Sequence, residues 1–567
     1  MAQGDVESHL ASGEETADAV SAVFTPIRLE REGTAGYSRT TTTEALAHSW
    51  SQNGYSCDPV LDPDESSEDD GPVKNDFVVG WDQGSQDPLC PRRFNTTRKW
   101  IIVSIVSMAS LCVTSASSIY GSTYAQMEAE FGNSRIVSTL GLSMFVLGIS
   151  LGPMLLSPLS EFYGQRPIYL VSWTMYIIWI IPQAVAKNIP TVIVGRFFDG
   201  LSGSAFLAVS AGTVGDLFNR DGLQGPMLMF SLAPFVGPAI GPVMGGFINY
   251  FTGWRWTYYV LLIWSFVIWL CIVFLVPETH RKLRGFLDAY VRFSDLALFD
   301  LDSIILKSKA IKKRKETSDD RWKAPMEMSD KSVASAIGHS LLRPFELLIF
   351  EPMCLNLCLF SAILLGILYL FFGAFPLVFR GVYGFNLWQS GLTFLGILTG
   401  MLFAAGLDPI FGRIRLNLVN NLSAETGVEG SSEPEFRLPS AIAGSVLVPA
   451  GIFMFGWSCF PWVHWIVPVI GSAIFGAGVV LVFNGIFTFL VDAYPQSAAS
   501  ALAANAFVRC AFAAAAFPLF GVQMYNKLNY HWASSLLAFL TVAMMPFPYL
   551  FFKFGKKIRA TSRFATS

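Results

Sequence analysis

Long apolar segments of similar length are the feature that most limits what this chain can fold into. A helix needs about 20 largely apolar residues to cross the hydrocarbon core of a bilayer. With 52% hydrophobic and only 14% charged residues, a soluble chain of this kind would aggregate. The pattern predicts an all-α membrane protein with twelve transmembrane helices, at 101–121, 136–158, 168–187, 190–213, 227–250, 257–276, 351–373, 386–407, 440–460, 463–490, 497–521 and 533–552.

Polar residues outside these segments divide the chain into five regions. Residues 1–98 are rich in Ser, Thr and acids and lack a sustained apolar period, which predicts a disordered arm. We expect six spans within 99–280, a basic linker at 281–345, six further spans within 346–553 and a basic tail at 554–567. No cleavable leader precedes the first span, so we expect that span to direct insertion. Because positive residues stay on the cytosolic side, the linker, the tail and both chain ends are expected in the cytosol.

The segment from Leu232 to Phe247, LAPFVGPAIGPVMGGF, combines membrane character with many glycines and prolines. Small residues allow helices to approach closely, and proline allows a helix to bend. We interpret the segment as a helix that moves against a partner, whereas the alternative is a packing face of the kind that any helical bundle contains. The residues that form its two stripes at four-residue spacing, with one further glycine, are Pro234, Gly237, Pro238, Gly241, Pro242, Gly245 and Gly246.

A second motif, GPMLLSPLSEFYGQRP, runs from Gly152 to Pro167 at the cytosolic end of the second span. Gly152 permits close packing, Gly164 lies in the turn, and Glu161 can pair with Arg166 at the helix end. We predict that these residues form a cytosolic gate, which holds one conformation closed until the pair separates. The alternative is an ordinary turn with a solvated ion pair worth about 0–1 kcal/mol.

Ionisable residues inside an apolar span cost about 2.5–3.5 kcal/mol to insert, so they need a partner or a water-filled cavity. In the fourth span, Arg196 and Asp199 are three residues apart and near enough to pair. We expect Asp199, or a water that it orders, to exchange a proton. The alternative is that both side chains extend to the lipid headgroups.

The eleventh span carries Arg509 within an alanine-rich segment, and Asn505 precedes it by one helical turn. On a regular helix the two side chains share a face, from which they could meet an anionic or polar group in a central cavity. We take both as candidates for the substrate cavity. The alternative is an isolated arginine with a structural role.

Other kinds of chemistry find no support in the sequence. The eight cysteines are dispersed without metal-ligand spacing, and none of the six histidines lies clearly in the middle of a span. Neither a P-loop nor a nucleophile constellation is present, so we expect no cofactor, no metal and no enzymatic activity. The expected partners are a small-molecule substrate, protons and the lipid bilayer, with no nucleic acid, and the expected state is a monomer.

With these motifs the chain resembles a fungal member of the major facilitator superfamily, in its twelve-span drug:proton antiporter group. The likeness covers about residues 99–557. It departs from the family pattern at Gln165, where an arginine is usual, and in the segment before the first span, DPLCPRRF. The stretches that carry it are 152–167, Arg196 with Gly200 and Gly203, 234–246, WRW at 254–256, PET at 277–279, RPFELL at 343–348, PEFRLP at 434–439 and AASALAANAFVR at 498–509.

The resemblance implies two six-helix halves that rock around a central site, with Arg196 in proton coupling, the 234–246 segment as an antiporter hinge, and Glu161 with Arg166 in gating. It implies a plasma-membrane efflux pump for amphipathic drugs, fungicides or toxic secondary metabolites, with the vacuolar membrane as the alternative location. Polyamine export is the alternative within transport. A facilitator, or a sensor that binds a solute and signals through the N-terminal arm, is the alternative of another class.

Overall fold

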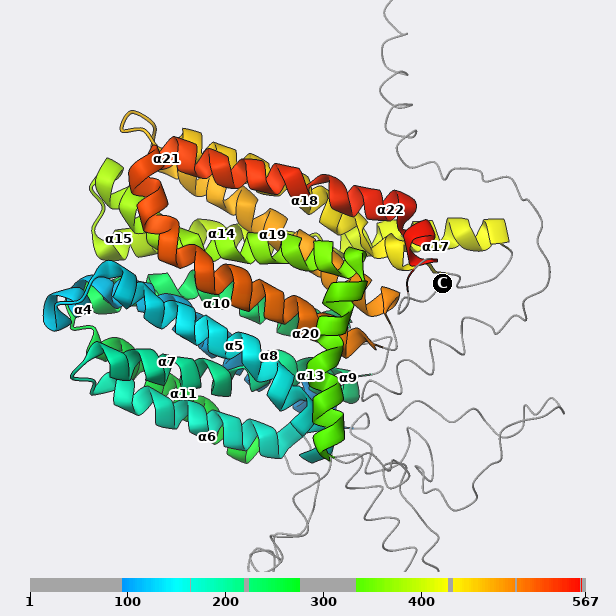
Figure 1. Cartoon of the computed structure of the whole chain (residues 1–567), viewed down its shortest axis with the longest axis horizontal. Coiled ribbons are helices and arrows are strands. Elements are labelled where there is room, and N and C mark those ends of the chain that lie inside the picture. Colours follow the sequence, from blue (N-terminus) through cyan, green and yellow to red (C-terminus); the bar gives the residue numbers. More distant parts are fainter. Residues whose placement is uncertain are drawn as a thin grey trace, which may run out of the picture. The chain divides into compact units, whose positions relative to one another are not determined.

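The computed structural model describes most of the chain from Phe94 onward, and every regular element in the described part is a helix. The predicted arm at 1–98 lies almost wholly outside the described residues, as does most of the predicted linker at 281–345. In Figure 1 the long helices lie side by side in one bundle. The described ranges are 94–163, 165–218, 224–275, 333–426, 432–494, 497–560 and residue 562.

Two helices of the N-terminal half, residues 94–275, begin at an asparagine cap, Asn95 and Asn188. The side chain of Asn188 accepts a hydrogen bond from Thr191 N (3.1 Å), and Pro190 follows in the first turn, where its missing N–H costs nothing. The elements of this half are α3 (Thr96–Ile119), η3 (Tyr120–Thr123), α4 (Tyr124–Phe131), α5 (Arg135–Tyr163), α6 (Gln165–Ala184), α7 (Ile189–Gly203), α8 (Ala205–Ala208), α9 (Ser210–Leu217), α10 (Gln224–Phe251) and α11 (Arg255–Leu275).

The C-terminal half, residues 333–562, contains two features that the sequence did not lead us to expect. A polar helix, α17, continues beyond the eighth predicted span, and seven residues after Phe507 form a π-helix, η8. The elements are α13 (Val333–Phe350), α14 (Pro352–Tyr383), α15 (Leu387–Leu392), α16 (Leu395–Gly406), α17 (Asp408–Thr426), η6 (Pro434–Arg437), α18 (Pro439–Trp457), α19 (Ile466–Ala493), α20 (Ala498–Phe507), η8 (Val508–Ala514), α21 (Ala515–Met544) and α22 (Pro546–Arg559).

Eleven helical stretches of the described chain are long and apolar enough to cross a membrane. The last, Ser500–Arg559, has 60 residues, and as one straight helix it would be about 90 Å long, three times the hydrocarbon core. It is broken at Asn529, whose φ of 61° and ψ of 165° are not helical, so it has room for both of the last two predicted spans. Twelve spans and cytosolic chain ends remain predictions.

Apolar side chains on the outside of the bundle suit a lipid environment. Phe274 is 76% exposed, Phe403 66% and Ile263 64%. Exposure of such large apolar side chains to water is unfavourable, whereas exposure to lipid is not. Inside each half the helices pack closely, with α3 against α10 and α18 against α19. The halves meet where α10 contacts α15 and α16, and where α5 contacts η8 and α21. From the N-terminal half, α5 and α10 make these contacts, and α3 adds a hydrogen bond between Ser117 and Tyr369 of α14.

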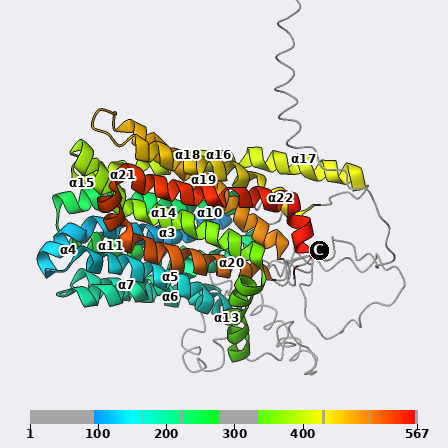
Figure 2. The same ribbon diagram turned by 45° about the horizontal axis from the view of Figure 1, so that its top comes forward.

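The last helix, α22, is held to the rest of the C-terminal half by a buried ion pair. The Nε and Nη2 atoms of Arg559 each donate to a carboxylate oxygen of Glu435 in η6, both at 2.8 Å. Arg559 is 4% exposed and Glu435 3%, so each charge depends on the other. Figures 1 and 2 show α13, α17 and α22 at the same end of the bundle, opposite α4 and α15.

Candidate functional site

Arg196 of α7 is completely buried, and its charge is stabilised by backbone oxygens and aromatic rings. Nη1 and Nη2 donate to Ala116 O at 2.9 Å, and Nη2 also donates to Ser117 O at 3.3 Å. The guanidinium carbon lies 4.5 Å from the ring centroid of Tyr120 and 4.2 Å from that of Phe145. Carbonyl dipoles and ring faces both attract a cation, so α3 and α5 together hold this charge inside the bundle.

Asp199 lies one turn further along α7 and is 1% exposed. Its Oδ2 atom accepts a hydrogen bond from Gln183 Nε2 at 3.3 Å, while Oδ1 is buried without a hydrogen-bond partner. In this structure no ion pair joins Arg196 to Asp199 among the described contacts, because the arginine side chain is directed to the carbonyl groups of α3; pairing in another state of the transport cycle stays a prediction. Asp199 is thus a buried carboxyl group with one oxygen left to accept or carry a proton.

Tyrosines surround this part of the N-terminal half, and the sequence analysis missed them. Within the described part of the chain, the hydroxyl groups of Tyr120 and Tyr258 are buried without hydrogen-bond partners, as is Gln183 Oε1. The buried hydroxyl groups of Tyr124 and Tyr176 have at most weak contacts, with Thr139 and Cys112. Tyr176 and Tyr258 lie within electrostatic range of Asp199, so the surroundings of this carboxyl group are polar. The available signal was the Tyr120 and Tyr124 pair, one turn apart in an apolar segment.

The glycine stripe of α10 faces α3 of the same half. A side chain at Gly241 would overlap the Ser118 hydroxyl, and one at Gly237 would overlap that of Thr114. At Gly245 a Cβ would lie only 2.8 Å from Ile119 Cγ1. The prediction of a close helix approach is confirmed, and the partner is α3.

A neighbouring face of α10 meets the other half of the molecule. A Cβ at Gly246 would lie 3.0 Å from Leu387 O, and one at Gly391 would lie 2.6 Å from Pro242 O. Phe247 packs beside Trp388, with ring centroids 5.6 Å apart. Within this helix Pro238 and Pro242 are buried and Pro234 is half-buried. The hinge role of the segment stays a prediction, but the C-terminal part of the helix, from Pro242 to Phe247, contacts the other half of the molecule.

The predicted cytosolic gate is only partly described. Gly152 packs against α7 and Ser204, where a Cβ would lie 2.9 Å from Leu201 O. Arg166 donates to Val273 O of α11 at 3.5 Å. Gly164 and the side chain of Glu161 lie outside the described residues, so the pairing of Glu161 with Arg166 stays a prediction.

Asn505 and Arg509 contact different helices. Asn505 is completely buried, and its Nδ2 donates to Ser361 Oγ of α14 at 3.1 Å. The π-helix η8 begins at Val508, between the two residues, and their shared role in a substrate cavity stays a prediction. The Arg509 guanidinium lies over Phe483 and Phe487 of α19, at 5.2 and 5.1 Å from the ring centroids.

A hydrogen bond joins the Arg196 site to the C-terminal half. Ser117 Oγ donates to Thr114 O at 2.6 Å, and the same oxygen lies 2.9 Å from the hydroxyl of Tyr369 in α14. Since the single serine proton is already used, Tyr369 is the donor in the second bond. The backbone oxygen of Ser117 accepts from Arg196. Ser117 therefore contacts both Arg196 and the C-terminal half.

Known proteins resemble this chain over most of its length. The family model described as Major Facilitator Superfamily matches residues 106–518. Efflux pump atB of Aspergillus terreus is 48% identical over 493 residues, which cover 87% of this chain and 91% of that protein. The probable drug/proton antiporter YHK8 of Saccharomyces cerevisiae is 38% identical over 513 residues, covering 89% and 93%.

Solved structures share the fold at low sequence identity. The xylose transporter XylE from E. coli, in a partially occluded inward-open conformation, has a TM-score of 0.53 at 15% identity, covering 81% of this chain and 98% of that one. The human organic anion transporter MFSD10 has a TM-score of 0.52 at 16% identity, covering 79% and 99%. At this identity the likeness concerns the arrangement of helices.

Proposed function

This chain belongs to the major facilitator superfamily, and we propose that it is a proton-coupled efflux transporter that exports amphipathic small molecules by alternating access. The relatives named an efflux pump and a drug/proton antiporter match nearly the whole chain, which supports the same activity here. A multi-pass membrane transporter of this family has no need of a catalytic centre. We propose the plasma membrane as its location and the monomer as its working unit.

The observation that carries the proton coupling is Asp199, the fully buried carboxyl group of α7 with an unpartnered oxygen. Among the described candidate spans it is the only acidic side chain buried in the bundle interior. We propose that Asp199 takes up a proton from one side and releases it to the other. Arg196, three residues away, holds the α3 carbonyl groups that connect through Ser117 to Tyr369 of the other half.

In this arrangement, protonation of Asp199 can change the relative position of the two halves. A charged Asp199 attracts Arg196, whereas a protonated Asp199 leaves the guanidinium to the carbonyl groups of α3. The two conditions therefore favour different positions of Arg196 relative to α3, and α3 carries the link to Tyr369. A two-state rocking motion needs a difference of this kind between its states.

The alternatives gain less support. A polyamine carries several positive charges and would need several acids in the cavity, whereas Asp199 is the only acid buried in the interior of the described spans. A sensor that signals through residues 1–98 stays the alternative of another class. Removing that segment separates the two, because a transporter keeps its flux and a sensor loses its output.

The test is efflux of a lipophilic fluorescent dye from cells that express the chain, with and without a proton uncoupler. We expect uncoupler-sensitive efflux in the wild type and its loss in Asp199→Asn. The matched control is Glu130→Gln, which removes the charge of a half-exposed acid paired with Arg255 at a helix end. Uncoupler-sensitive efflux that survives in Asp199→Asn would move the proton site elsewhere. Efflux that does not respond to the uncoupler in any variant would contradict the proposal that the chain is a proton antiporter.

A further inference from the structure

Arg509 is a cation of the C-terminal half that has no acidic partner among the described residues. Its side-chain contacts there are the rings of Phe483 and Phe487 and the thiol of the neighbouring Cys510, and its Nε atom is buried without a hydrogen-bond partner in that part of the chain. Arg196 in the other half, by contrast, donates to two carbonyl groups. A guanidinium inside a membrane protein that contacts only ring faces and a thiol retains most of its capacity to bind an anion.

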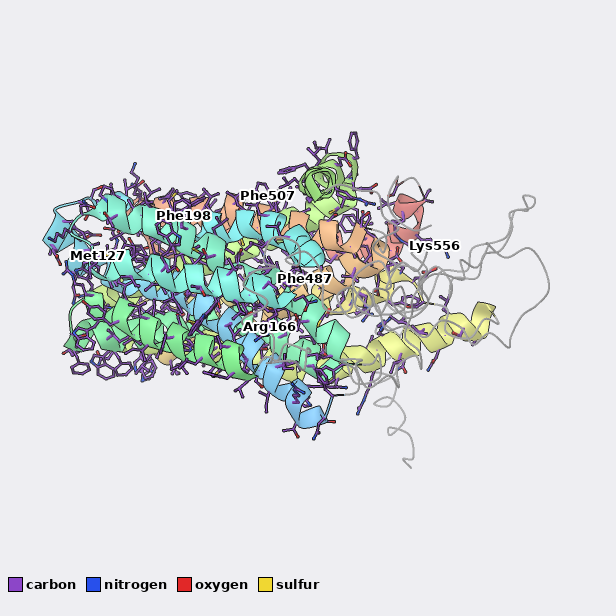
Figure 3. The ribbon with its side chains drawn as sticks, turned by 90° about the horizontal axis from the view of Figure 1, so that it is seen from below. Met127, Arg166, Phe198, Phe487, Phe507 and Lys556 are labelled. Atoms are coloured by element: carbon purple, nitrogen blue, oxygen red, sulfur yellow. The ribbon has the colours of Figure 1, made fainter. Side chains whose placement is uncertain are left out.

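The surroundings of Arg509 are aromatic and come from both halves. Phe483 and Phe487 of α19 lie beneath the guanidinium, and Phe235 of α10 stacks on Phe483 with centroids 4.9 Å apart. Figure 3 shows Phe487 between the two ends of the bundle, which are marked by Met127 and Lys556. Flat rings beside a forked cation suit a molecule with an aromatic body and a carboxylate or phenolate group.

A second observation lies nearer the end that carries α4 and α15. A cavity of about 50 Å³ lies between the halves, and its lining includes Arg135, Arg380, Pro242 and Phe372. None of its lining residues is acidic. Arg135 is paired with Glu128, whereas Arg380 has no ion pair among the described residues. The cavity is far smaller than the roughly 300–1,000 Å³ of a ligand site, so it fits the closed remnant of a path lined by positive charge.

We propose that the exported substrates are amphipathic organic anions, in which an aromatic body carries one acidic group. Arg509 binds the acidic group over Phe483 and Phe487, and Arg380 favours its departure along the interface between the halves. The inference rests on the proposed efflux function and adds the substrate class to it. It also makes the cycle electrogenic, because one proton entering and one monoanion leaving move two elementary charges inward.

The substrate test uses two dyes that share one aromatic body and differ in charge. At neutral pH 1-pyrenebutyrate is a monoanion and 1-pyrenebutylamine is a monocation. In the wild type we expect butyrate efflux to exceed butylamine efflux. Arg509→Gln should reduce butyrate efflux about tenfold, the loss expected from one charge-assisted hydrogen-bond pair, and should not lower the smaller butylamine efflux. Arg509→Lys keeps the charge without the fork and should raise the KM for butyrate. The matched control is Lys527→Gln, which removes an exposed charge from α21.

The amount of folded protein at the membrane is measured for every variant. Equal losses of both dyes in Arg509→Gln and Arg509→Lys would make Arg509 a structural residue and overturn the inference. Butylamine efflux without butyrate efflux in the wild type would overturn the inference and leave the proposed function standing. Efflux of neither dye, together with no uncoupler effect on any lipophilic dye, would overturn both the inference and the proposed function.

The charge movement is tested in proteoliposomes that contain the full chain and a membrane potential set by potassium and valinomycin. At a fixed pH gradient, a potential negative on the proton-receiving side should accelerate butyrate exchange several-fold. It should leave the exchange of butylamine for a proton nearly unchanged, since that exchange moves no net charge. Butyrate exchange that ignores the potential would contradict the inferred anionic substrate.

Discussion

Around Arg196 the N-terminal half buries charges and hydroxyl groups, whereas around Phe375 the C-terminal half buries aromatic rings. The ring of Phe375 lies 4.5 Å from that of Phe394, 5.1 Å from that of Phe455 and 5.2 Å from that of Phe371. In the first half, buried tyrosine hydroxyls lack hydrogen-bond partners among the described residues. The difference agrees with the proposed division of work, in which the first half handles protons, while the rings around Phe375 form a close-packed apolar core in the second.

The largest expected effect comes from Arg196→Ala. It removes the cation from a fully buried site and leaves Asp199 and two α3 carbonyl groups without it. Breaking one member of a buried charge system costs about 3–5 kcal/mol, so we expect no efflux and less protein at the membrane. Efflux and membrane expression are the measurements. Arg196→Lys is the control that keeps the charge, and wild-type efflux in Arg196→Ala would end the assignment of proton handling to this half.

Phe375→Ala tests the other half and should act on stability alone. It leaves a cavity among close-packed rings, for which the loss is about 3–5 kcal/mol. We expect a lower melting temperature but an unchanged uncoupler response per folded molecule. The control is Phe403→Ala, because Phe403 is 66% exposed toward lipid and its removal should have little effect. A changed uncoupler response would show that the two halves are not divided as described.

The sequence predicted the packing of the helices better than it predicted their polar contacts. The spacing of Gly237, Gly241 and Gly245 predicted a close helix approach because periodicity fixes which residues share a face. The identity of the partner helix, α3, depends on tertiary packing and was not predictable in this way. For Asn505 and Arg509 the same periodicity says less, since the two side chains contact different helices, α14 and α19.

The polar contacts were predicted least well because they join distant segments. The sequence placed Arg196 near enough to Asp199 to pair, but it gave no sign of the carbonyl groups 79 and 80 residues earlier in the chain to which Arg196 bonds in the structure. The tyrosine cluster assembles from single residues on separate helices, which no local pattern reveals. Membrane spans, by contrast, follow from composition over about 20 residues.

Removing the bond between the halves should have a moderate effect. Ser117→Ala and Tyr369→Phe each delete one side of the 2.9 Å contact, and a double-mutant cycle isolates their coupling. We expect a coupling energy of about 0.5–1.5 kcal/mol in thermal stability, the usual contribution of a neutral hydrogen bond. We also expect slower efflux in each single variant. A coupling energy of zero would mean that the two halves communicate through other contacts.

The smallest effect on stability is expected from Tyr258→Phe. Its hydroxyl group is buried without a partner, so the free energy of unfolding should change by less than about 0.5 kcal/mol and should not fall as it does in Tyr369→Phe. If the hydroxyl group serves proton passage to Asp199, the ratio of proton flux to dye flux should nevertheless fall. The measurement is proton uptake beside dye efflux in the same proteoliposomes. A lower stability with an unchanged flux ratio would make Tyr258 an ordinary packing residue, and the polar interior of the N-terminal half would then have to be explained by Arg196 and Asp199 alone.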